Sequence, residues 1–440
     1  MRPGGSVGVT PPVNPNLAPR RELAAAKGVG RNTLETVLFR GLSTPTALVF
    51  VVVQSRLLEA EGRGEFVVVV LGATIVSRLL GQLGVAVTSR LRDATVPVAG
   101  LTRRALGLGI ALGVVGAPIM AAVTAESGQV STKLAILGAL GIVPNIAWQT
   151  ISGVLLGQGR IQLWNVIQLL APVLALLALL VLVAGLDTGV SGALAGWALG
   201  NTLTAVFALG AARDLWWPPT PPRLLDGAGR TILRLALVMG AVQVVNLISY
   251  RAELFVLGQE SGNAAVGIYS IALQAVESMW LVPAAIATAV TAPVVSAEDD
   301  RRAAAIVARS AIRSLGLATL IAGAVAGIAP FLIPAVFGKE FKGAVVPLEL
   351  LLPGVVVYAP VTVLVVYLSV RKAEPWWTLA VSLASMLVTV GAAVLLIPGH
   401  AARGAAGASA IGYGAGTALA WGFFAALSRR DAKGIPALSG

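Results

Sequence analysis

Gly64-Glu65-Phe66 opens one long apolar segment of the chain and Gly267-Ile268-Tyr269 opens another, so the two motifs stand 203 residues apart, from 64 to 267. A second pair of landmarks, Gly192-Ala193 and Gly404-Ala405, repeats at a spacing of 212 residues, from 192 to 404. One pattern of hydrophobic segments is therefore duplicated along the chain. A duplication of an even number of membrane spans keeps both halves the same way up, as in transporters whose halves rock around a central site. The repeat favours a transporter.

The composition requires a lipid environment, because a chain that is 57% hydrophobic and 12% charged would aggregate in water. The mean hydropathy is +0.86. A segment of about 20 apolar residues crosses a hydrocarbon core about 30 Å thick, so we expect an all-α integral membrane protein of about twelve transmembrane helices. The helices form two pseudo-symmetric six-helix lobes around a central cavity. The expected spans are residues 33–58, 65–89, 105–124, 133–157, 163–186, 190–212, 232–258, 265–296, 311–335, 344–369, 376–397 and 404–427.

The chain divides into five expected segments. Residues 1–31 form a disordered cytoplasmic tail, 32–213 the N-terminal lobe, 214–230 a cytoplasmic linker, 231–428 the C-terminal lobe and 429–440 a second cytoplasmic tail. The linker is rich in proline, which forbids a continuous helix.

The distribution of basic residues predicts the orientation. With both termini inside, 23 of the 32 Lys and Arg residues fall in cytoplasmic tails and loops and six fall outside, and basic residues are retained on the cytoplasmic side. We therefore expect a multi-pass protein of the cytoplasmic membrane. The net charge of +12 does not indicate nucleic-acid binding, because the basic residues form short runs between spans. Without cysteine, and with His400 as its one histidine, the sequence predicts no metal site.

Five ionisable residues lie deep within the expected spans: Arg40, Arg78, Arg251, Glu253 and Glu277. Each charge facing lipid would cost about 2.5–3.5 kcal/mol, so we expect all five to face protein or water. They occupy the first two spans of each half. Arg40 and Arg78 are therefore expected to line a cavity from one lobe, and the other three to line it from the opposite lobe.

Several pairings remain open at this point. Arg251 and Glu253 are two positions apart, so they face different sides of a helix and each needs another partner. Glu277 can pair with Arg251 or with Arg78, and such a pair can serve transport or only lock two helices together. Arg40 can instead reach the cytoplasmic headgroups by extending its side chain, and Glu253 can reach the outer surface.

A cavity with three guanidinium groups suits a phosphate-bearing substrate, because arginine keeps its charge and offers planar donors that match phosphate oxygens. Four amide side chains in the spans can add hydrogen bonds to sugar hydroxyls, or can instead join helices to one another. They are Asn145, Gln149, Asn246 and Gln274.

Several motifs resemble those of one known family. Tyr250-Arg251-Ala252-Glu253, Gly267-Ile268-Tyr269-Ser270-Ile271-Ala272, Glu277 and Leu281-Val282-Pro283 resemble the seventh and eighth helices of polysaccharide flippases of the O-antigen type. These flippases belong to the multidrug/oligosaccharidyl-lipid/polysaccharide (MOP) exporter superfamily. Further similar stretches are Gly62-Arg63-Gly64-Glu65-Phe66 with the first outer loop, Phe337-Gly338 with the fifth, and Gly404-Ala405-Ala406-Gly407-Ala408 with the last helix.

The resemblance implies a fold like that of multidrug and toxic compound extrusion (MATE) transporters, and a function. Members move a polyprenyl-diphosphate-linked glycan across the membrane by alternating access. By position, Arg251, Arg78 and Arg40 would bind the diphosphate, and Glu277 and Glu253 would serve coupling or gating. No cofactor is implied, although Na⁺ or H⁺ can be the coupling ion. Expected partners are membrane lipids, the lipid-linked glycan, and a glycan polymerase or glycosyltransferases.

Three other classes of protein share part of this pattern. A drug or cation antiporter of the same superfamily shares the fold but is expected to bury more acids than bases, whereas here the buried arginines outnumber the glutamates. A major-facilitator transporter carries an Asp-Arg-x-Gly-Arg element after its second span, which residues 88–95 lack. An integral-membrane enzyme needs acid and base groups beside a sizeable outer loop, and no expected outer loop exceeds about ten residues.

Overall fold

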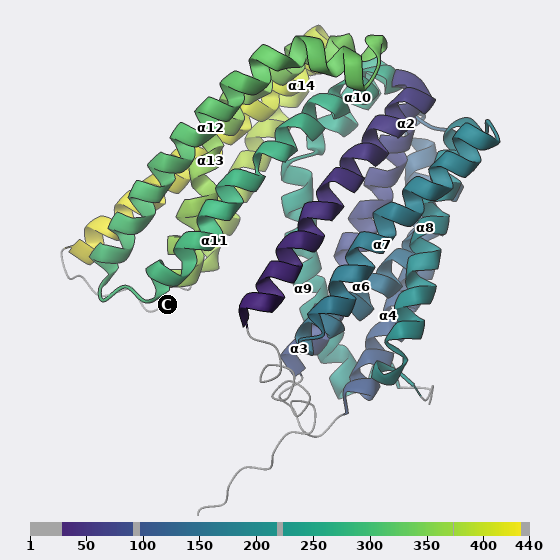
Figure 1. The fold of residues 1–440 in the computed structure, drawn as a ribbon, viewed down its shortest axis with the longest axis horizontal. Helices are drawn as coiled ribbons and strands as arrows, with labels where there is room; N and C mark the ends of the chain where they lie inside the picture. Colours follow the sequence, from purple (N-terminus) through teal and green to yellow (C-terminus); the bar gives the residue numbers. More distant parts are fainter. Residues whose placement is uncertain (1–28, 91–96, 218–222, 373, 433–440) are drawn as a thin grey trace, which may run out of the picture.

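The computed structural model describes residues 29–90, 97–217, 223–372 and 374–432, with nearly all side chains between Thr46 and Arg430. Every regular element in these ranges is a helix. Figure 1 shows two bundles that meet beside α10, at the top of the view, and diverge toward the end where α3 and α11 lie. The predicted tail of residues 1–31 lies almost entirely outside the described residues.

The N-terminal lobe contains the first nine described elements. They are α2 (Val29–Leu80), α3 (Leu83–Arg90), α4 (Val98–Glu126), α5 (Thr132–Leu140), α6 (Ile142–Gly157), α7 (Ile161–Leu179), the π-helical turn η2 (Leu180–Gly185), α8 (Gly189–Ala211) and the 3₁₀ turn η3 (Arg213–Leu215).

The C-terminal lobe follows. Its elements are α9 (Gly227–Ser249), α10 (Ala252–Met279), α11 (Leu281–Val295), α12 (Asp300–Val336), the 3₁₀ turn η4 (Lys339–Ala344), α13 (Val345–Val365), the π-helical turn η5 (Val366–Arg371) and α14 (Pro375–Ala432). Its first helix, α9, begins at Gly227, four residues before the predicted boundary at 231. This helix packs mainly against the N-terminal lobe, where Gly240 lies against the backbone of Leu79 and where Ile232 and Ala236 join a core of N-terminal residues.

Ten helical stretches among the described residues are long and apolar enough to cross a membrane. Three of them run through a non-helical residue where the chain reverses, namely Glu59 in α2, Gly262 in α10 and Ala401 in α14. The part of α10 before Gly262 continues the crossing that α9 begins. Divided in this way, the stretches give twelve crossings, which agrees with the number expected from the sequence.

The reversals preserve the duplication. Glu59 and Gly262 both have positive φ, 58° and 78°, and they stand 203 residues apart, from 59 to 262. Gly189 and Ala401 have φ of 57° and 48° and stand 212 apart, from 189 to 401. These spacings equal those of the sequence landmarks. The two lobes therefore turn at equivalent positions.

The lobes dock through a surface that we call the seam, formed by Ala60, Arg63, Gly64, Asn263, Gly267 and Ser270 of α2 and α10. A methyl group built on Gly64 would lie 1.8 Å from the carbonyl oxygen of Asn263, and one built on Gly267 would lie 1.8 Å from that of Ala60. The contacts are reciprocal, because both Gly64 and Gly267, and Ala60 and Asn263, are 203 residues apart. Only residues without a side chain let the backbones approach this closely.

Arg63 crosses the seam from the centre of the packed surface, and its residue is only 3% exposed. Its Nε donates to Ser270 Oγ of the other lobe at 2.8 Å, and its Nη1 donates to Gln54 Oε1 at 2.9 Å. A straight helix would separate residues 54 and 63 by about 13.5 Å along its axis. The hydrogen bond between Arg63 and Gln54 therefore forms because the chain reverses at Glu59. Among the described residues no carboxylate pairs with this guanidinium.

Candidate functional site: a charged cavity between the lobes

The seventh crossing is interrupted beside the cavity. The sequence predicted one span over residues 232–258, but α9 ends at Ser249 and α10 starts at Ala252, with Arg251 at φ −140° between them. The hydroxyl of Ser249 bonds to the carbonyl of Val245 at 2.7 Å and lies 3.2 Å from the carbonyl of Ser382. Because Arg251 lies outside both helical ladders, its side chain is free to turn toward the space between the lobes.

The eighth crossing is interrupted as well. Its predicted span, 265–296, is divided at Trp280, where α10 ends and α11 begins. Pro283 explains this break, because it has no N–H to donate to the carbonyl four residues earlier and its ring clashes with that carbonyl. Glu277 thus stands in the last turn of α10, beside the break.

The two breaks bring Arg251 and Glu277 together. Arg251 Nη2 forms an ion pair with Glu277 Oε1, and the two side chains are 24% and 35% exposed. Of the two partners that the sequence left open for Glu277, the structure therefore selects Arg251. A pair this exposed is screened by water and contributes little to stability, so it remains available for exchange with another charged group.

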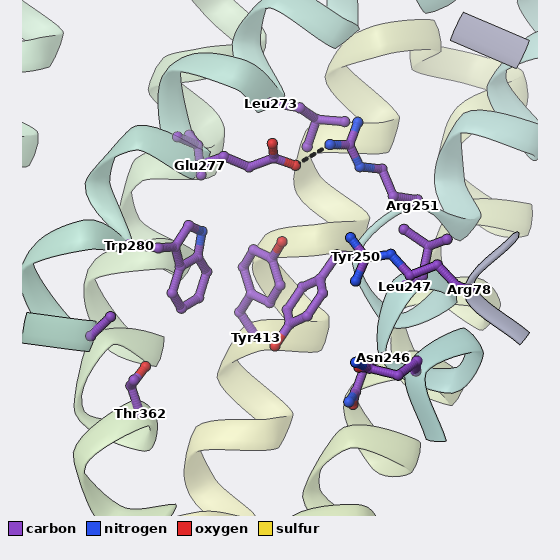
Figure 2. Close-up of a pocket in the computed structure, with 13 residues that line it drawn as sticks. Arg78, Asn246, Leu247, Tyr250, Arg251, Leu273, Glu277, Trp280, Thr362 and Tyr413 are labelled. Carbon is purple, nitrogen blue, oxygen red and sulfur yellow. Dashed lines mark hydrogen bonds and ion pairs between the residues drawn. The ribbon is translucent and has the colours of Figure 1, made fainter. Parts of the chain in front are cut away.

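The pair lines a cavity of about 540 Å³ between the lobes, and Figure 2 shows the side chains around it. Arg78 reaches this cavity from α2 of the N-terminal lobe. Its side chain is exposed, and no described residue forms a hydrogen bond or ion pair with it. The other polar lining residues are Gln243, Asn246 and Thr362, and the aromatic ones are Tyr250, Trp280 and Tyr413. Two arginines and one glutamate give the cavity a net positive charge.

Glu253 does not line the cavity, contrary to the prediction, and it does not reach the surface either. It is 0% exposed, and its Oε1 accepts a hydrogen bond from the Tyr269 hydroxyl at 3.3 Å. Glu253 lies in the first turn of α10, where the positive end of the helix dipole stabilises a negative charge. The break before α10 thus separates the environments of Arg251 and Glu253.

Of the four amide side chains expected to contact sugar hydroxyls, one lines the cavity and three do not. Asn246 lines the cavity, whereas Gln274 is half-buried outside the lining. Asn145 donates to Asn201 at 2.7 Å and accepts from Gln149, so these residues connect α6 with α8 and each other inside the N-terminal lobe. The structure places neither of them in the cavity lining.

Arg40 lies within α2, but its side chain falls outside the described residues, so its predicted role stays a prediction. Sequence reasoning missed Arg63 as a contact between lobes, although Gly62-Arg63-Gly64 was noted in a motif. It also missed the aromatic lining, whose members come from helices far apart in the chain.

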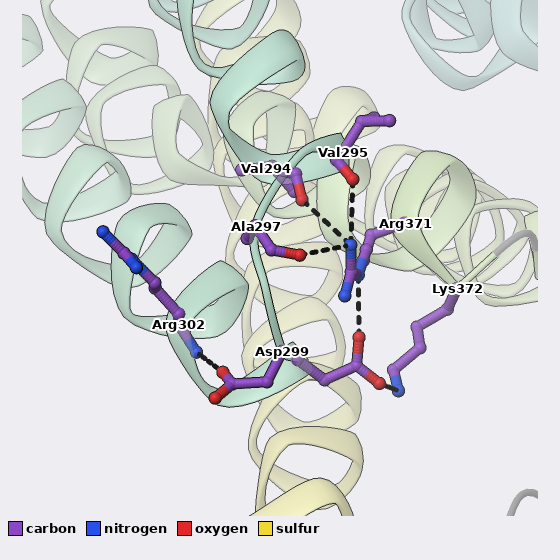
Figure 3. Close-up of polar contacts among 8 residues, drawn as sticks. Val294, Val295, Ala297, Asp299, Arg302, Arg371 and Lys372 are labelled. Carbon is purple, nitrogen blue, oxygen red and sulfur yellow. Dashed lines mark hydrogen bonds and ion pairs between the residues drawn. The ribbon is translucent and has the colours of Figure 1, made fainter.

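A second cluster of charges joins the end of α11 to the start of α12, and none of its residues lines the cavity (Figure 3). Arg371 donates to the carbonyls of Val295 and Ala297 at 2.9 and 3.2 Å and to Asp300 Oδ1 at 2.7 Å. Lys372 pairs with Asp300 Oδ2 at 2.6 Å. Each of these charges is satisfied by a partner, so this cluster fastens α11, α12 and η5 together and offers no binding site.

Comparison with solved structures supports the fold. An inward-facing multidrug resistance MATE family transporter of the MOP superfamily superposes with a TM-score of 0.73 and 17% identity, covering 90% of this chain and 99% of that one. The lipid II flippase MurJ, in an inward closed conformation, gives 0.71 with 9% identity and 91% coverage of both chains. A MOP superfamily transporter from Pyrococcus furiosus, described as having a binding pocket of reverse polarity, gives 0.60 with 17% identity and covers 91% of this chain and 95% of that one.

A search among curated proteins found no match. The structural likenesses confirm the predicted all-helical, two-lobed fold of the MOP superfamily and place the chain in a membrane as a multi-pass protein. A family model described as "Polysaccharide biosynthesis protein" matches residues 95–346. Because this match spans more than half of the sequence, the chain belongs to the polysaccharide biosynthesis protein family, which agrees with the resemblance of its motifs to polysaccharide flippases.

Proposed function

We propose that the protein moves a polyprenyl-diphosphate-linked oligosaccharide, the repeat unit of a polysaccharide, across the cytoplasmic membrane by alternating access. The main support is that Arg78 and Arg251 line one cavity from opposite lobes, where Glu277, paired with Arg251, is the one acidic residue of the lining. Guanidinium groups hold a diphosphate by charge and by paired hydrogen bonds. The family to which the chain belongs supports a glycan substrate.

The orientation is part of the proposal. The seam closes one end of the molecule, and the bundles diverge at the other end, where α3 ends at Arg90 and η5 ends at Arg371 (Figure 1). Basic residues concentrate on the cytoplasmic side of membrane proteins. The diverging end and both termini therefore face the cytoplasm, and the seam closes the outer side.

Glu277 is proposed to couple transport to an ion gradient, of Na⁺ or H⁺. Its carboxylate holds Arg251 while the cavity has no substrate, and a diphosphate entering the cavity competes for the same guanidinium. Release of Glu277 lets it accept a cation, so substrate binding and ion binding are linked. The buried carboxyl of Glu253 is proposed to assist this exchange from behind the cavity wall. A glycan polymerase or glycosyltransferases are the proposed protein partners.

The second candidate function is a drug or cation antiporter, because a multidrug resistance MATE family transporter has the same fold. An organic cation needs an acidic cavity, because two guanidinium groups would repel it. Arg78 has no acidic partner among the described residues, and the one acid, Glu277, is already paired. The charge balance thus favours the anionic lipid substrate.

The test is deletion of the gene followed by mass spectrometry of the lipid-linked oligosaccharides. Deletion is expected to cause accumulation of a polyprenyl-diphosphate glycan on the cytoplasmic leaflet, and the wild-type gene is expected to clear it. An unchanged lipid-linked pool, together with new sensitivity to organic cations, would instead establish the antiporter.

A further inference from the structure

Four aromatic residues form one continuous wall beside the charged part of the cavity. They are Tyr250 and Trp280 at the two helix breaks, Tyr358 of α13 and Tyr413 of α14. All six pairs among them are in contact, with ring centroids 5.3–6.5 Å apart. Tyr358 is 5% exposed and supports the wall from behind. Tyr250 and Trp280 are half-buried and line the cavity together with Tyr413, which is 3% exposed.

The residue types in this wall differ from those of an ordinary membrane core. Three of the chain's five tyrosines stand in it, and none of its ten phenylalanines does. Tyrosine and tryptophan combine a large apolar face with one polar atom, which suits a surface that meets both apolar groups and water. The wall is therefore built for contact with an amphipathic group rather than for packing alone.

A smaller pocket of about 260 Å³ continues from the same wall. It shares Asn246, Tyr250 and Thr362 with the main cavity. Its remaining polar lining consists of the hydroxyls of Tyr358, Thr378 and Ser382, and it contains no charged residue. An anion or a cation would find no counter-charge there, whereas a neutral, hydroxylated group would find aromatic faces together with amide and hydroxyl partners.

The order of these groups matches the order within a glycosyl diphosphate. Figure 2 shows Arg251 and Glu277 on one side of the aromatic rings, and Asn246 and Thr362 on the other. A diphosphate at the arginines would place the sugar attached to it against the rings. A sugar ring presents C–H groups on its faces and hydroxyls at its edge, which are complementary to the rings and to the polar side chains respectively.

We infer that the Tyr250–Trp280 face is the subsite for the first sugar of the substrate, which stacks there while Arg78 and Arg251 hold the diphosphate. This inference rests on the proposed function, since it assigns a part of the same substrate to a part of the same cavity. It makes Trp280 a residue that distinguishes glycosylated from bare polyprenyl diphosphate.

The test uses the full-length protein in lipid nanodiscs with two probes, undecaprenyl diphosphate and the same lipid carrying one N-acetylglucosamine. Two variants separate stacking from bulk: Trp280→Phe keeps an aromatic face, and Trp280→Leu keeps only apolar volume. The wild type and Trp280→Phe are expected to bind the glycosylated probe more tightly than the bare one. Trp280→Leu is expected to lose roughly two- to tenfold in affinity for the glycosylated probe alone, the range of an aromatic contact beyond area burial.

A second variant covers the case in which Trp280→Leu fails to fold. Thr362→Val has nearly the same shape, lines both pockets, and is expected to weaken only the glycosylated probe. Equal weakening of both probes, or equal binding of both by the wild type, would overturn the inference and leave the diphosphate site intact. Binding of neither probe by the wild type would reject the proposed function itself, and the sugar subsite with it.

Discussion

At the seam the two lobes use matching residues, whereas in the cavity they do not. Gly64 and Gly267 each pack on a carbonyl of the other lobe, and the reversals at Glu59 and Gly262 stand at equivalent positions. The positions equivalent to Arg78, Arg251 and Glu277, at the same spacing of 203, are Leu281, Leu48 and Thr74. The duplication was thus kept where the lobes must dock and abandoned where the substrate is proposed to bind.

The seam provides the largest expected effect. Gly64→Val and Gly267→Val each place atoms where a backbone carbonyl of the other lobe lies, so the state with this end closed should be lost. Overpacking of this kind shifts a conformational equilibrium by roughly tenfold to a hundredfold or more, and transport should fall accordingly. The fall in transport is measured as glycan export by a deletion strain that carries each variant gene.

The control for the seam is Gly210→Ala in α8, because a methyl group on Gly210 meets no atom within 4 Å. It should export normally. The symmetry also predicts that the two valine variants behave alike, and a defect in only one of them would show that the lobes do not dock as equals.

In the cavity, Arg251→Ala should reduce export by roughly tenfold or more while the protein still inserts, because the charge-assisted hydrogen bond that this guanidinium is proposed to give the diphosphate contributes about 1.5–3 kcal/mol. Arg251→Lys should rescue only partly, since the planar guanidinium fork is lost. Arg234→Ala is the matched control, because Arg234 lies on α9 but outside the cavity lining. Full export by Arg251→Ala would remove this residue from the site.

Glu277→Gln is expected to separate binding from coupling. The neutral amide no longer holds Arg251 by charge, so undecaprenyl diphosphate should bind a few-fold more tightly, as expected for release of a partly exposed pair. Export should at the same time stop responding to the ion gradient. Binding to nanodisc-embedded protein and gradient-driven export from vesicles measure the two effects. An unchanged gradient response would assign coupling elsewhere.

The reversals provide a smaller effect of opposite sign in the two lobes. Glu59, at φ 58° and ψ −173°, occupies a region that is costly for any residue except glycine. Glu59→Gly should therefore raise the free energy of unfolding by about 1–3 kcal/mol, and Gly262→Ala should lower it by a similar amount. Denaturation in detergent micelles compares them. The same sign for both would contradict the equivalence of the two turns.

The smallest expected effect lies at the diverging end. Arg104 Nε bonds to Asp226 Oδ2 at 2.9 Å, and Asp226 Oδ1 caps α9 by accepting from the Gly229 N–H at 2.8 Å. The hydrogen bond from Arg104, followed by that from Gly229, lowers the pKa of Asp226 from 3.8 to about 2. A lowered pKa stabilises the fold above the unfolded value, and this contribution is lost as the pH falls through about 2.

Asp226→Asn should therefore lower the melting temperature modestly, by the same amount at every pH between about 5 and 8, since Asp226 stays charged throughout this window. Melting in detergent across that range measures it. If the difference in melting temperature between Asp226→Asn and the wild type changed with pH around a midpoint near neutrality, the lowered pKa of Asp226 would be disproved.

Much of the fold was predictable from the sequence, because hydropathy and the repeat of Gly64 at Gly267 determine the spans and the two lobes. The breaks at Tyr250 and Trp280 were not predictable in the same way. No glycine or proline marks the first, and Pro283 lies three residues after the second. The burial of Glu253 was missed because hydropathy does not distinguish a protein neighbour from lipid. The aromatic wall combines residues from positions 250 to 413 that only tertiary packing brings together.

The buried guanidinium of Arg63 has a consequence for the energetics of the transport cycle. A cation removed from water without a counter-charge raises the free energy of the closed seam, which offsets part of the stabilisation from backbone contacts there. When the lobes part, that charge regains its hydration. Separating the lobes at the seam therefore costs less free energy than the backbone contacts there would require if Arg63 were uncharged.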